Sequence, residues 1–257
     1  MRRKSAEFLV TARQACKSGT ILFMHNDNTT RRFDLIAFDW DGTLFDSTAS
    51  IVRCLQEAVQ DVGGTRPTHE QASYVIGLSL PLALRHVAGD ISADKYPLLT
   101  ERFRYHYVRH MNDITLFDGA VELLHKLRDQ GYKLAVATGK NRRGLDEVLQ
   151  TVNLTQVFHA TRTADQTASK PDPLMLHELM EELDVTPQRT LMVGDTTHDL
   201  QMALNAGCPS VAVSFGAHKP TVFSNFKPLF VADNIAALSD WIFQPTPTPS
   251  NASVAFS

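Results

Sequence analysis

The chain has 257 residues, of which 43% are hydrophobic and 21% are charged, and its formal net charge at pH 7 is −3. This length suits one sizeable domain or a domain with a smaller inserted one, and the charge excludes the basic field typical of nucleic-acid-binding proteins. Cys16, Cys54 and Cys208 have neither metal-site nor disulfide spacing, which predicts a reducing, cytoplasmic environment. Because no apolar run reaches about 18 residues, we predict no membrane-spanning helix.

Both ends of the chain are predicted to lie outside the folded part. Residues 1–32 read as an N-terminal extension that is either disordered or mis-started, with Met24 as the hypothetical true initiator. Residues 244–257 are rich in Pro, Thr and Ser and are predicted to form a disordered tail. The fold is therefore expected between residues 33 and 243.

The first predicted strand leads directly into two carboxylates. The apolar run 35–38 is short and is followed by Asp39, Asp41, Gly42 and Thr43, which is typical of a buried central strand that ends in a glycine turn. Strands of open α/β sheets present their ligands at the carboxyl edge. Two carboxylates at that edge repel each other unless a cation or a shared proton relieves them. The pair therefore indicates a hard divalent cation with nucleophilic and acid/base chemistry.

The remaining pattern predicts an α/β fold with a helical insertion. Residues 47–61 have helical spacing, and the segment 65–115 contains only predicted helices, at 68–75, 79–87 and 92–110. From residue 118 helices and strands alternate. The predicted helices are 120–130, 142–152, 173–183, 199–206 and 235–243, and the predicted strands are 133–137, 158–161, 190–193, 210–213 and 229–231. This alternation predicts a Rossmann-like parallel sheet with helices on both faces. We assign residues 33–62 and 116–243 to this core domain and residues 63–115 to an inserted α-helical cap.

Four short segments lie at strand ends or helix starts on the predicted carboxyl edge. They are DWDGT at 39–43, ATGK at 137–140, SKPDP at 169–173 and GDTTHD at 194–199. Each is weak alone, but in this order they resemble the motifs of the haloacid dehalogenase superfamily, over residues 34 to about 241. The position of the insertion resembles the small helical cap of subfamily I, and the chain looks like the phosphoglycolate phosphatase-like phosphatases. The resemblance implies an Mg²⁺-dependent phosphatase that hydrolyses a small phosphate monoester through an aspartyl-phosphate.

The residue types at these positions suit phosphoryl transfer. Asp39 is expected to attack phosphorus, and Asp41 to protonate the leaving oxygen and then activate water. Thr138 and the backbone around Gly139 offer donors to the phosphoryl oxygens. Lys170 supplies a positive charge that holds Asp39 and the phosphoryl group together.

A metal site is expected beside these groups. Asp195 and Asp199 are four residues apart at a helix start, which places them on one face. There they complete an Mg²⁺ site with Asp39 and the backbone carbonyl of Asp41, because oxygen-only ligands favour Mg²⁺ over zinc. The resemblance makes Asp195 the direct ligand and Asp199 a ligand through water.

Several of these side chains also have a plain structural interpretation. Thr138 could serve as a helix N-cap, Lys170 as a solvated loop lysine, and Asp199 as a first-turn acid favoured by the helix dipole. His198 is expected to be exposed or bonded locally.

Two further residues lie near the same edge. We expect Lys140 and Asn141 to start a helix.

The insertion is expected to set specificity. Gly77, Leu78 and Ser79 are the candidate substrate contacts, while Arg104 and Arg109 are either anion holders or, as we prefer, part of a solvated helix face. The insertion has no cluster of basic residues that would indicate a phosphorylated carboxylate as the substrate. The predicted substrate is therefore given only as a small phosphorylated metabolite. The expected protein is a monomer or dimer that binds neither nucleic acid nor membrane.

Alternatives within and outside the family stay open. Asp41 argues against a dehalogenase, because halide-removing relatives lack an acid there. Lys95 is the lone lysine of residues 63–115, and nothing nearby marks it as a Schiff-base residue for phosphonate cleavage. A sugar phosphomutase or a pyrophosphatase remains an alternative, as does a non-catalytic regulator or binding module that retains the fold.

Overall fold

The computed structural model describes residues 31–110 and 115–244. The predictions for the N-terminal extension, including Met24 and Cys16, and for the C-terminal tail fall almost entirely outside the described residues. Within the described part, no helix is long and apolar enough to cross a membrane.

Six parallel strands form one sheet in the order β3-β2-β1-β4-β5-β6. Their bounds are Leu35–Phe38 (β1), Lys133–Thr138 (β2), Ala160–Thr163 (β3), Thr190–Gly194 (β4), Ser210–Val213 (β5) and Val231–Ala232 (β6). Strand β1 lies between β2 and β4, where Phe38 is in register with Val136 and Val193. All four residues of β1 are buried. Asp39 therefore lies at the carboxyl end of a central strand of the sheet.

Alternate side chains of the strands pack into two separate cores. Ile36 and Phe38 belong to a cluster with α5 (Ala120–Asp129), α6 (Arg142–Thr151) and α9 (Ile235–Phe243). Leu35 and Ala37 belong to a second cluster with α7 (Leu174–Leu183) and α8 (Thr197–Asn205). Burial on both faces explains why β1 is an unbroken apolar run. The predicted α/β class, with helices on both faces of a parallel sheet, is confirmed.

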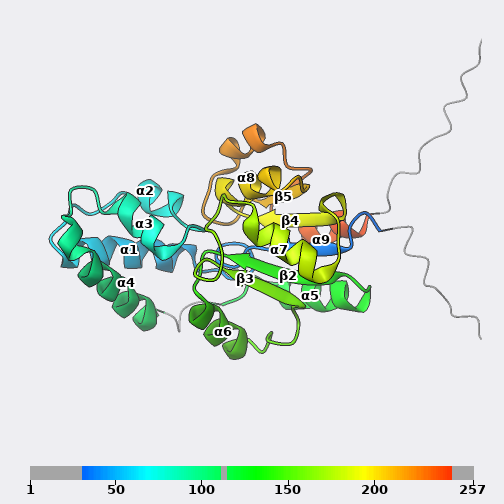
Figure 1. Ribbon diagram of the computed structural model, residues 1–257, viewed down its shortest axis with the longest axis horizontal. Coiled ribbons are helices and arrows are strands. Elements are labelled where there is room, and N and C mark those ends of the chain that lie inside the picture. Colours follow the sequence, from blue (N-terminus) through cyan, green and yellow to red (C-terminus); the bar gives the residue numbers. More distant parts are fainter. Residues whose placement is uncertain (1–30, 111–114, 245–257) are drawn as a thin grey trace, which may run out of the picture. The chain divides into compact units, whose positions relative to one another are not determined.

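The insertion and the helix that precedes it form a helical unit with its own core. Its helices are α1 (Thr48–Asp61), α2 (His69–Tyr74), α3 (Leu80–Val87) and α4 (Tyr96–His110), with a short 3₁₀ turn at Ala93–Lys95. Figure 1 shows them as a group distinct from the strands. Leu55 and Val59 of α1 share one buried cluster with Leu84 of α3 and Leu99 of α4. Helix α1, which was assigned to the core domain, packs with the helices of the insertion in this cluster, and the domain boundary between residues 62 and 63 stays a prediction.

The two crossings between the sheet and the helical unit lie side by side. Phe45 pairs with Leu116 in an antiparallel bridge. The N–H of Asp46 donates to the carbonyl of Thr115 at 2.8 Å, and the N–H of Phe117 donates to the carbonyl of Leu44 at 3.0 Å. The entry and exit of the helical unit are thus tied to each other by backbone hydrogen bonds.

Most predicted elements occur within one or two residues of their expected bounds, including β3 at Ala160–Thr163, which was expected at 158–161. There are two larger differences. The helix expected at 92–110 begins only at Tyr96, because Ala93–Lys95 forms a separate 3₁₀ turn. A 3₁₀ segment at Pro220–Phe226, which places Phe223 in a small core with Leu200 and Ala212, was not predicted.

Candidate active site

Asp39 directly follows β1, and a tight turn that contains Asp41 begins at the next residue. The carbonyl of Trp40 accepts hydrogen bonds from the N–H groups of Leu44 at 3.1 Å and Phe45 at 3.0 Å. Gly42 has φ +87°, in the left-handed region that side chains rarely adopt. A Cβ atom at Gly42 would also lie 2.2 Å from Oδ2 of Asp195. Glycine at this position therefore allows both the turn and the close approach of another carboxylate.

Asp39 is buried and paired with a lysine. Its exposed fraction is 1%, and its Oδ1 accepts from Nζ of Lys170 at 2.5 Å. Lys170 is itself 1% exposed and forms a second ion pair with Oδ1 of Asp199 at 2.6 Å. Burial lowers the pKa of Lys170, but the charges of Asp199 and Asp39 outweigh burial and raise the pKa above its usual range. Lys170 is therefore a buried charged group and not a solvated loop lysine.

Three buried carboxylates converge at this point. Asp39, Asp195 and Asp199 each offer an oxygen, and these oxygens lie within 4.8 Å of one another. Asp195 accepts from Oγ1 of Thr43 at 3.0 Å and from the N–H of Ala217 at 2.6 Å. Oδ2 of Asp39 is buried and has no hydrogen-bond partner among the described residues. The cluster therefore offers at least one carboxylate oxygen to a ligand.

Asp199 joins this cluster to the start of α8. Its Oδ2 accepts from the N–H of Thr196 at 3.1 Å and from the hydroxyl of Thr196 at 2.7 Å, as in a capping box. Its Oδ1 contacts Lys170. Asp199 thus acts both as a first-turn acid of the helix and as a member of the acidic cluster.

The charges of this cluster do not balance within the described chain. Three ionised carboxylates beside Lys170 would leave a charge of about −2 in a buried space. Burial raises the pKa of Asp39 well above its ordinary value, with Lys170 opposing and the charges of Asp199 and Asp195 adding. Burial and the charge of Asp199 raise the pKa of Asp195 to about 7. A divalent cation with a preference for oxygen ligands fits both the missing charge and the donor set.

Asp41 lies outside this carboxylate cluster and has its own partners. Its Oδ1 accepts from Oγ of Ser47 at 2.7 Å, and its Oδ2 forms an ion pair with Nζ of Lys140 at 3.0 Å. Nζ of Lys140 also donates to the hydroxyl of Tyr107 at 2.7 Å. A side-chain metal contact from Asp41 is therefore not part of this arrangement, and the expected ligation through its backbone carbonyl stays a prediction.

The two partners of Asp41, Ser47 and Lys140, and the contact of Lys140 with Tyr107 were not predicted from the sequence. The helix after β2 begins at Arg142, and its N-cap is Asn141, whose side chain accepts from the N–H of Gly144 at 2.8 Å. The expectation that Lys140 merely starts this helix was wrong, because its ammonium reaches Asp41. Its place directly after the Thr-Gly pair was the available signal. Nothing in the sequence indicates that Tyr107 faces this lysine.

Thr138 lies at the end of β2 and is 1% exposed. Its hydroxyl oxygen accepts from the N–H of Lys140 at 3.2 Å, and among the described residues its own proton has no acceptor. Because Asn141 is the N-cap of α6, Thr138 does not have the plain capping role. Its hydroxyl is available to donate to a ligand oxygen.

The loop 77–79 contacts three of the four motif segments. A Cβ atom at Gly139 would lie 2.5 Å from the carbonyl oxygen of Leu78 and 2.6 Å from that of Gly77. The N–H of Ser79 donates to Oγ of Ser169 at 3.0 Å. A Cβ atom at Gly77 would lie 3.2 Å from Oγ1 of Thr196. The loop therefore covers the carboxyl edge of the sheet, where the candidate residues meet.

The other candidates in the helical unit lie elsewhere. Arg104 and Arg109 are exposed on α4, and Arg109 donates to the hydroxyl of Tyr105 at 2.6 Å. Lys95 donates to the carbonyl of Val62 at 3.0 Å. His198 was expected to be exposed or bonded locally, which is wrong. It is 8% exposed, and its Nε2 lies 2.7 Å from the carbonyl oxygen of Tyr74, so it joins α8 to α2.

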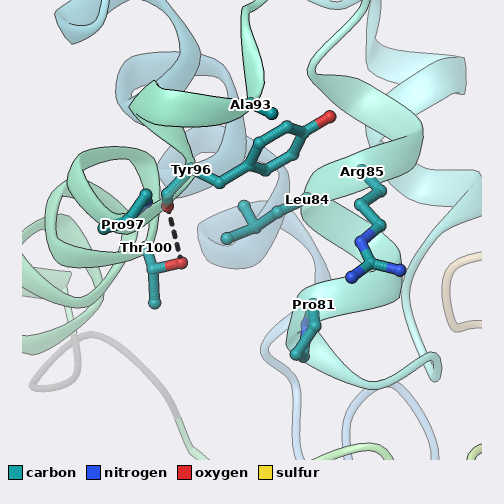
Figure 2. A pocket seen from close by; sticks show the side chains of 7 residues that line it. All are labelled: Pro81, Leu84, Arg85, Ala93, Tyr96, Pro97 and Thr100. Atoms are coloured by element: carbon teal, nitrogen blue, oxygen red, sulfur yellow. Dashed lines mark hydrogen bonds between the residues drawn. The ribbon is translucent and has the colours of Figure 1, made fainter.

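A surface groove on the helical unit is separate from this site. It is lined by Pro81, Leu84, Arg85, Ala93, Tyr96, Pro97 and Thr100. Figure 2 shows these side chains on α3, the 3₁₀ turn and the start of α4, with Thr100 bonded to the carbonyl of Tyr96 at 2.9 Å. None of the residues in the four motif segments lines this groove, so the groove is not part of the candidate active site.

A parallel α/β sheet carries a buried Asp–Lys pair and a cluster of three carboxylates that could hold a metal ion at its carboxyl edge, which is the arrangement of a hydrolase active site. The profile of the haloacid dehalogenase-like hydrolases matches residues 36–213. The chain belongs to this family, which confirms the resemblance seen in the four motif segments.

Named relatives and solved structures agree with this assignment. The phosphoglycolate phosphatase of Aliivibrio fischeri is 34% identical over 213 residues, which cover 79% of this chain and 94% of the relative. The pyrophosphatase PpaX of Bacillus mycoides is 29% identical over 209 residues, which cover 80% and 95%. The crystal structure of a predicted phosphoglycolate phosphatase from Haemophilus somnus has a TM-score of 0.75 at 24% identity and covers 82% of this chain and 98% of that chain. The last comparison supports the fold alone.

Proposed function

We propose that this hydrolase is an Mg²⁺-dependent phosphatase that cleaves a small phosphate monoester through an aspartyl-phosphate on Asp39. The observation that carries the proposal is the state of Asp39: one oxygen is held by Lys170, and the other is buried without a hydrogen-bond partner among the described residues. A carboxylate fixed in this way is oriented for attack. The names of the relatives, phosphoglycolate phosphatase and pyrophosphatase, support phosphoryl chemistry.

The first half-reaction transfers the phosphoryl group to the protein. An oxygen of Asp39 forms a bond to phosphorus while the bond from phosphorus to the leaving oxygen breaks. Asp41 gives its proton to that leaving oxygen. Lys170 and the hydroxyl of Thr138 are placed to bind the phosphoryl oxygens and thereby stabilise the charge that they carry.

The second half-reaction regenerates the enzyme. Asp41, now a carboxylate, takes a proton from a water molecule that attacks phosphorus, and the bond to Asp39 breaks to release inorganic phosphate. Ser47 and Lys140 hold the side chain of Asp41 in place for both steps. Asp39, Asp195 and Asp199 would hold the Mg²⁺ ion, which supplies positive charge to the phosphoryl group when bound.

The loop 77–79 supports a closed reaction chamber. Its contacts with Gly139, Ser169 and Thr196 cover the carboxyl edge, which would exclude water from the site and favour transfer to Asp39. We retain Gly77, Leu78 and Ser79 as proposed substrate contacts on this ground.

Two alternatives have different support. A pyrophosphatase shares every step above and is supported by the relative of that name. A non-catalytic module does not account for a buried cluster that combines Asp39, Lys170, Asp195 and Asp199. A cytoplasmic location and a small phosphorylated metabolite as the partner are part of the proposal.

The test is turnover of p-nitrophenyl phosphate with Mg²⁺ and with excess EDTA. We expect activity that depends on Mg²⁺ and that falls by about 1,000-fold or more in Asp39→Asn. Asp46→Asn is the control, because this aspartate is exposed on the same turn. Acid quenching with ³²P-labelled substrate should leave label on wild-type protein and none on Asp39→Asn. Comparable activity of Asp39→Asn and wild type would rule out the aspartyl-phosphate.

A further inference from the structure

The carbonyl of Tyr74, the last residue of α2, is bound by two histidines from the sheet domain. Nε2 of His198 lies 2.7 Å from this carbonyl oxygen, and Nε2 of His218 lies 3.1 Å from it. Both histidines, which we call the histidine pair, are buried. The last carbonyls of a helix have no partner within the helix, so the histidine pair satisfies a group that α2 leaves open.

The hydrogen-bond partners decide which ring nitrogens carry the protons. Nδ1 of His218 accepts from the N–H of Thr197 at 3.0 Å, so the proton of this ring is on Nε2. Nε2 of His198 faces a carbonyl oxygen, which accepts and cannot donate, so this nitrogen also carries a proton. Each ring therefore donates one N–H, and together they use both lone pairs of the Tyr74 oxygen.

The ring of Tyr74 packs against the same histidines. It stacks on His218 with ring centroids 5.6 Å apart and planes 6° apart, and it meets His198 edge-on at 5.2 Å. His86 of α3 lies 5.1 Å from the same ring. Aromatic pairs at such separations add stability beyond the area that they bury. The backbone and the side chain of Tyr74 are thus both bound to α8 and to the loop 214–219.

Both histidines lie on segments that also build the acidic cluster. His198 directly precedes Asp199 on α8. The N–H of His218 donates to the carbonyl of Asp195 at 3.3 Å. A Cβ atom at Gly216 would lie 2.2 Å from Oδ2 of Asp195, so the loop 214–219 packs closely around this carboxylate. The histidine pair is therefore fixed in place relative to the candidate metal ligands.

The loop 77–79 is held on both sides by the sheet domain. On one side, the N–H of Ser79 donates to Oγ of Ser169 at 3.0 Å. On the other side, Tyr74 lies three residues before Gly77 and is bound by the histidine pair. A short segment between two fixed points keeps few of its conformations. Release of Tyr74 would therefore leave the contacts of residues 77–79 themselves to hold the loop over the carboxyl edge.

We infer that His198 and His218 are positioning residues that hold the loop 77–79 closed over the acidic cluster by binding the carbonyl of Tyr74. The inference rests on the proposed function, in which this loop contacts the substrate, and it identifies the side chains that fix the loop to the sheet domain. No step of the proposed chemistry uses either histidine, so both act through the loop.

The test is hydrogen–deuterium exchange, measured by mass spectrometry on the peptide that covers residues 75–80. Exchange of this peptide should be about tenfold faster in His198→Leu than in wild type, because one hydrogen bond to Tyr74 is lost. It should be about 100-fold faster when His218→Leu is added. Exchange at the wild-type rate in these variants would overturn the inference. If the double variant does not fold, His198→Leu alone decides.

Two matched variants separate the hydrogen bond from the bulk of the ring. His198→Gln retains an N–H donor at the place of Nε2, so exchange of residues 75–80 should return to within about threefold of the wild-type rate. If His198→Gln exchanged as fast as His198→Leu, ring packing and not the hydrogen bond would hold the loop, and the inference would be overturned. His177→Leu, at an exposed histidine of α7, is the control and should leave this exchange unchanged.

The response to Mg²⁺ separates loop positioning from support of the acidic cluster. Mg²⁺ should raise the melting temperature of His198→Leu by as much as it raises that of wild type, because the three carboxylates are retained. A response that is lost in His198→Leu would mean that the histidine supports the cluster itself, and it would overturn the inference.

Turnover separates this inference from the proposed function. The kcat/KM for p-nitrophenyl phosphate should fall by about tenfold in the double variant, because a loop that opens no longer completes the site. Unchanged kcat/KM beside faster exchange would remove the loop from the reaction and overturn the positioning role. Absence of Mg²⁺-dependent turnover in wild type would instead overturn the proposed function, while exchange of residues 75–80 still reports on the histidine pair.

Discussion

Replacement of Asp195 by asparagine should stabilise the metal-free protein at high pH and not at low pH. Asp195 is fully buried beside Asp39 and Asp199, and in the absence of a cation its pKa is raised from 3.8 to about 7, mainly by burial. The folded state then binds a proton more tightly than the unfolded state. Stability therefore falls as pH rises from about 4 to about 7.

The magnitude follows from the size of this shift. At about 1.4 kcal/mol per pH unit, a rise from 3.8 to about 7 costs the metal-free wild type about 4 kcal/mol at pH 8. Asparagine has no charge, but it cannot accept from both Thr43 and Ala217, and one lost hydrogen bond costs about 1–3 kcal/mol. The variant should then be more stable than wild type by about 2 kcal/mol at pH 8, or about 4–8 °C in Tm.

The assay is thermal unfolding in EDTA at pH 5 and pH 8, repeated with Mg²⁺. Between pH 5 and pH 8 the stability of the variant relative to wild type should grow by about 3 kcal/mol. With Mg²⁺ at 100 times its Kd, wild type should gain about 2.7 kcal/mol and the variant much less. Asp129→Asn, an exposed aspartate at the end of α5, is the control. If Asp195→Asn were equally destabilising at both pH values, the charge argument for a metal site would be refuted.

Two other substitutions test the loop and the helical unit. Gly139→Ala would place a Cβ atom within 2.6 Å of the carbonyl oxygens of Leu78 and Gly77, so the loop must move away from the sheet. We expect kcat/KM to fall by about 10- to 100-fold and Tm to fall as well; unchanged kinetics would show that the loop contact has no part in turnover. Leu99→Ala should lower the free energy of unfolding by about 2–5 kcal/mol, because Leu99 is fully buried between α1, α3 and α4. Its neighbour Leu98 is 41% exposed, and denaturation of Leu98→Ala should show a change within about 0.5 kcal/mol; equal losses would contradict the packing described for α4.

The sheet and its reactive edge could be predicted because they depend on local signals. The run 35–38 became β1 with the predicted bounds, since a short apolar run before a glycine turn has few other solutions. Parallel strands bring their carboxyl ends to one edge, so motif segments far apart in sequence could be expected to meet. The convergence of Asp39, Lys170 and Asp195 follows from that rule.

The contacts of the helical unit could not be predicted in the same way. Periodicity shows that α1 has an apolar stripe, but it does not show whether a sheet or another helix covers that stripe. Tyr107 is one of several aromatic residues on α4, and only tertiary packing selects it to face Lys140. Asp199 shows a further limit, because the sequence offered it as a first-turn acid or as a metal ligand through water and did not indicate its ion pair with Lys170.

The paired crossings at residues 44–46 and 115–117 have a consequence for how such enzymes diversify. The chain segment that enters the helical unit is hydrogen-bonded to the segment that returns from it. The sheet domain therefore holds the two ends of the inserted segment together, whatever fold lies between them. An inserted segment of another length or fold can then replace the residues between these two crossings. Such a replacement would not disturb β1, Asp39 or the turn that follows. Selection for a new leaving group can therefore act on an exchangeable module while the phosphoryl-transfer chemistry is inherited intact.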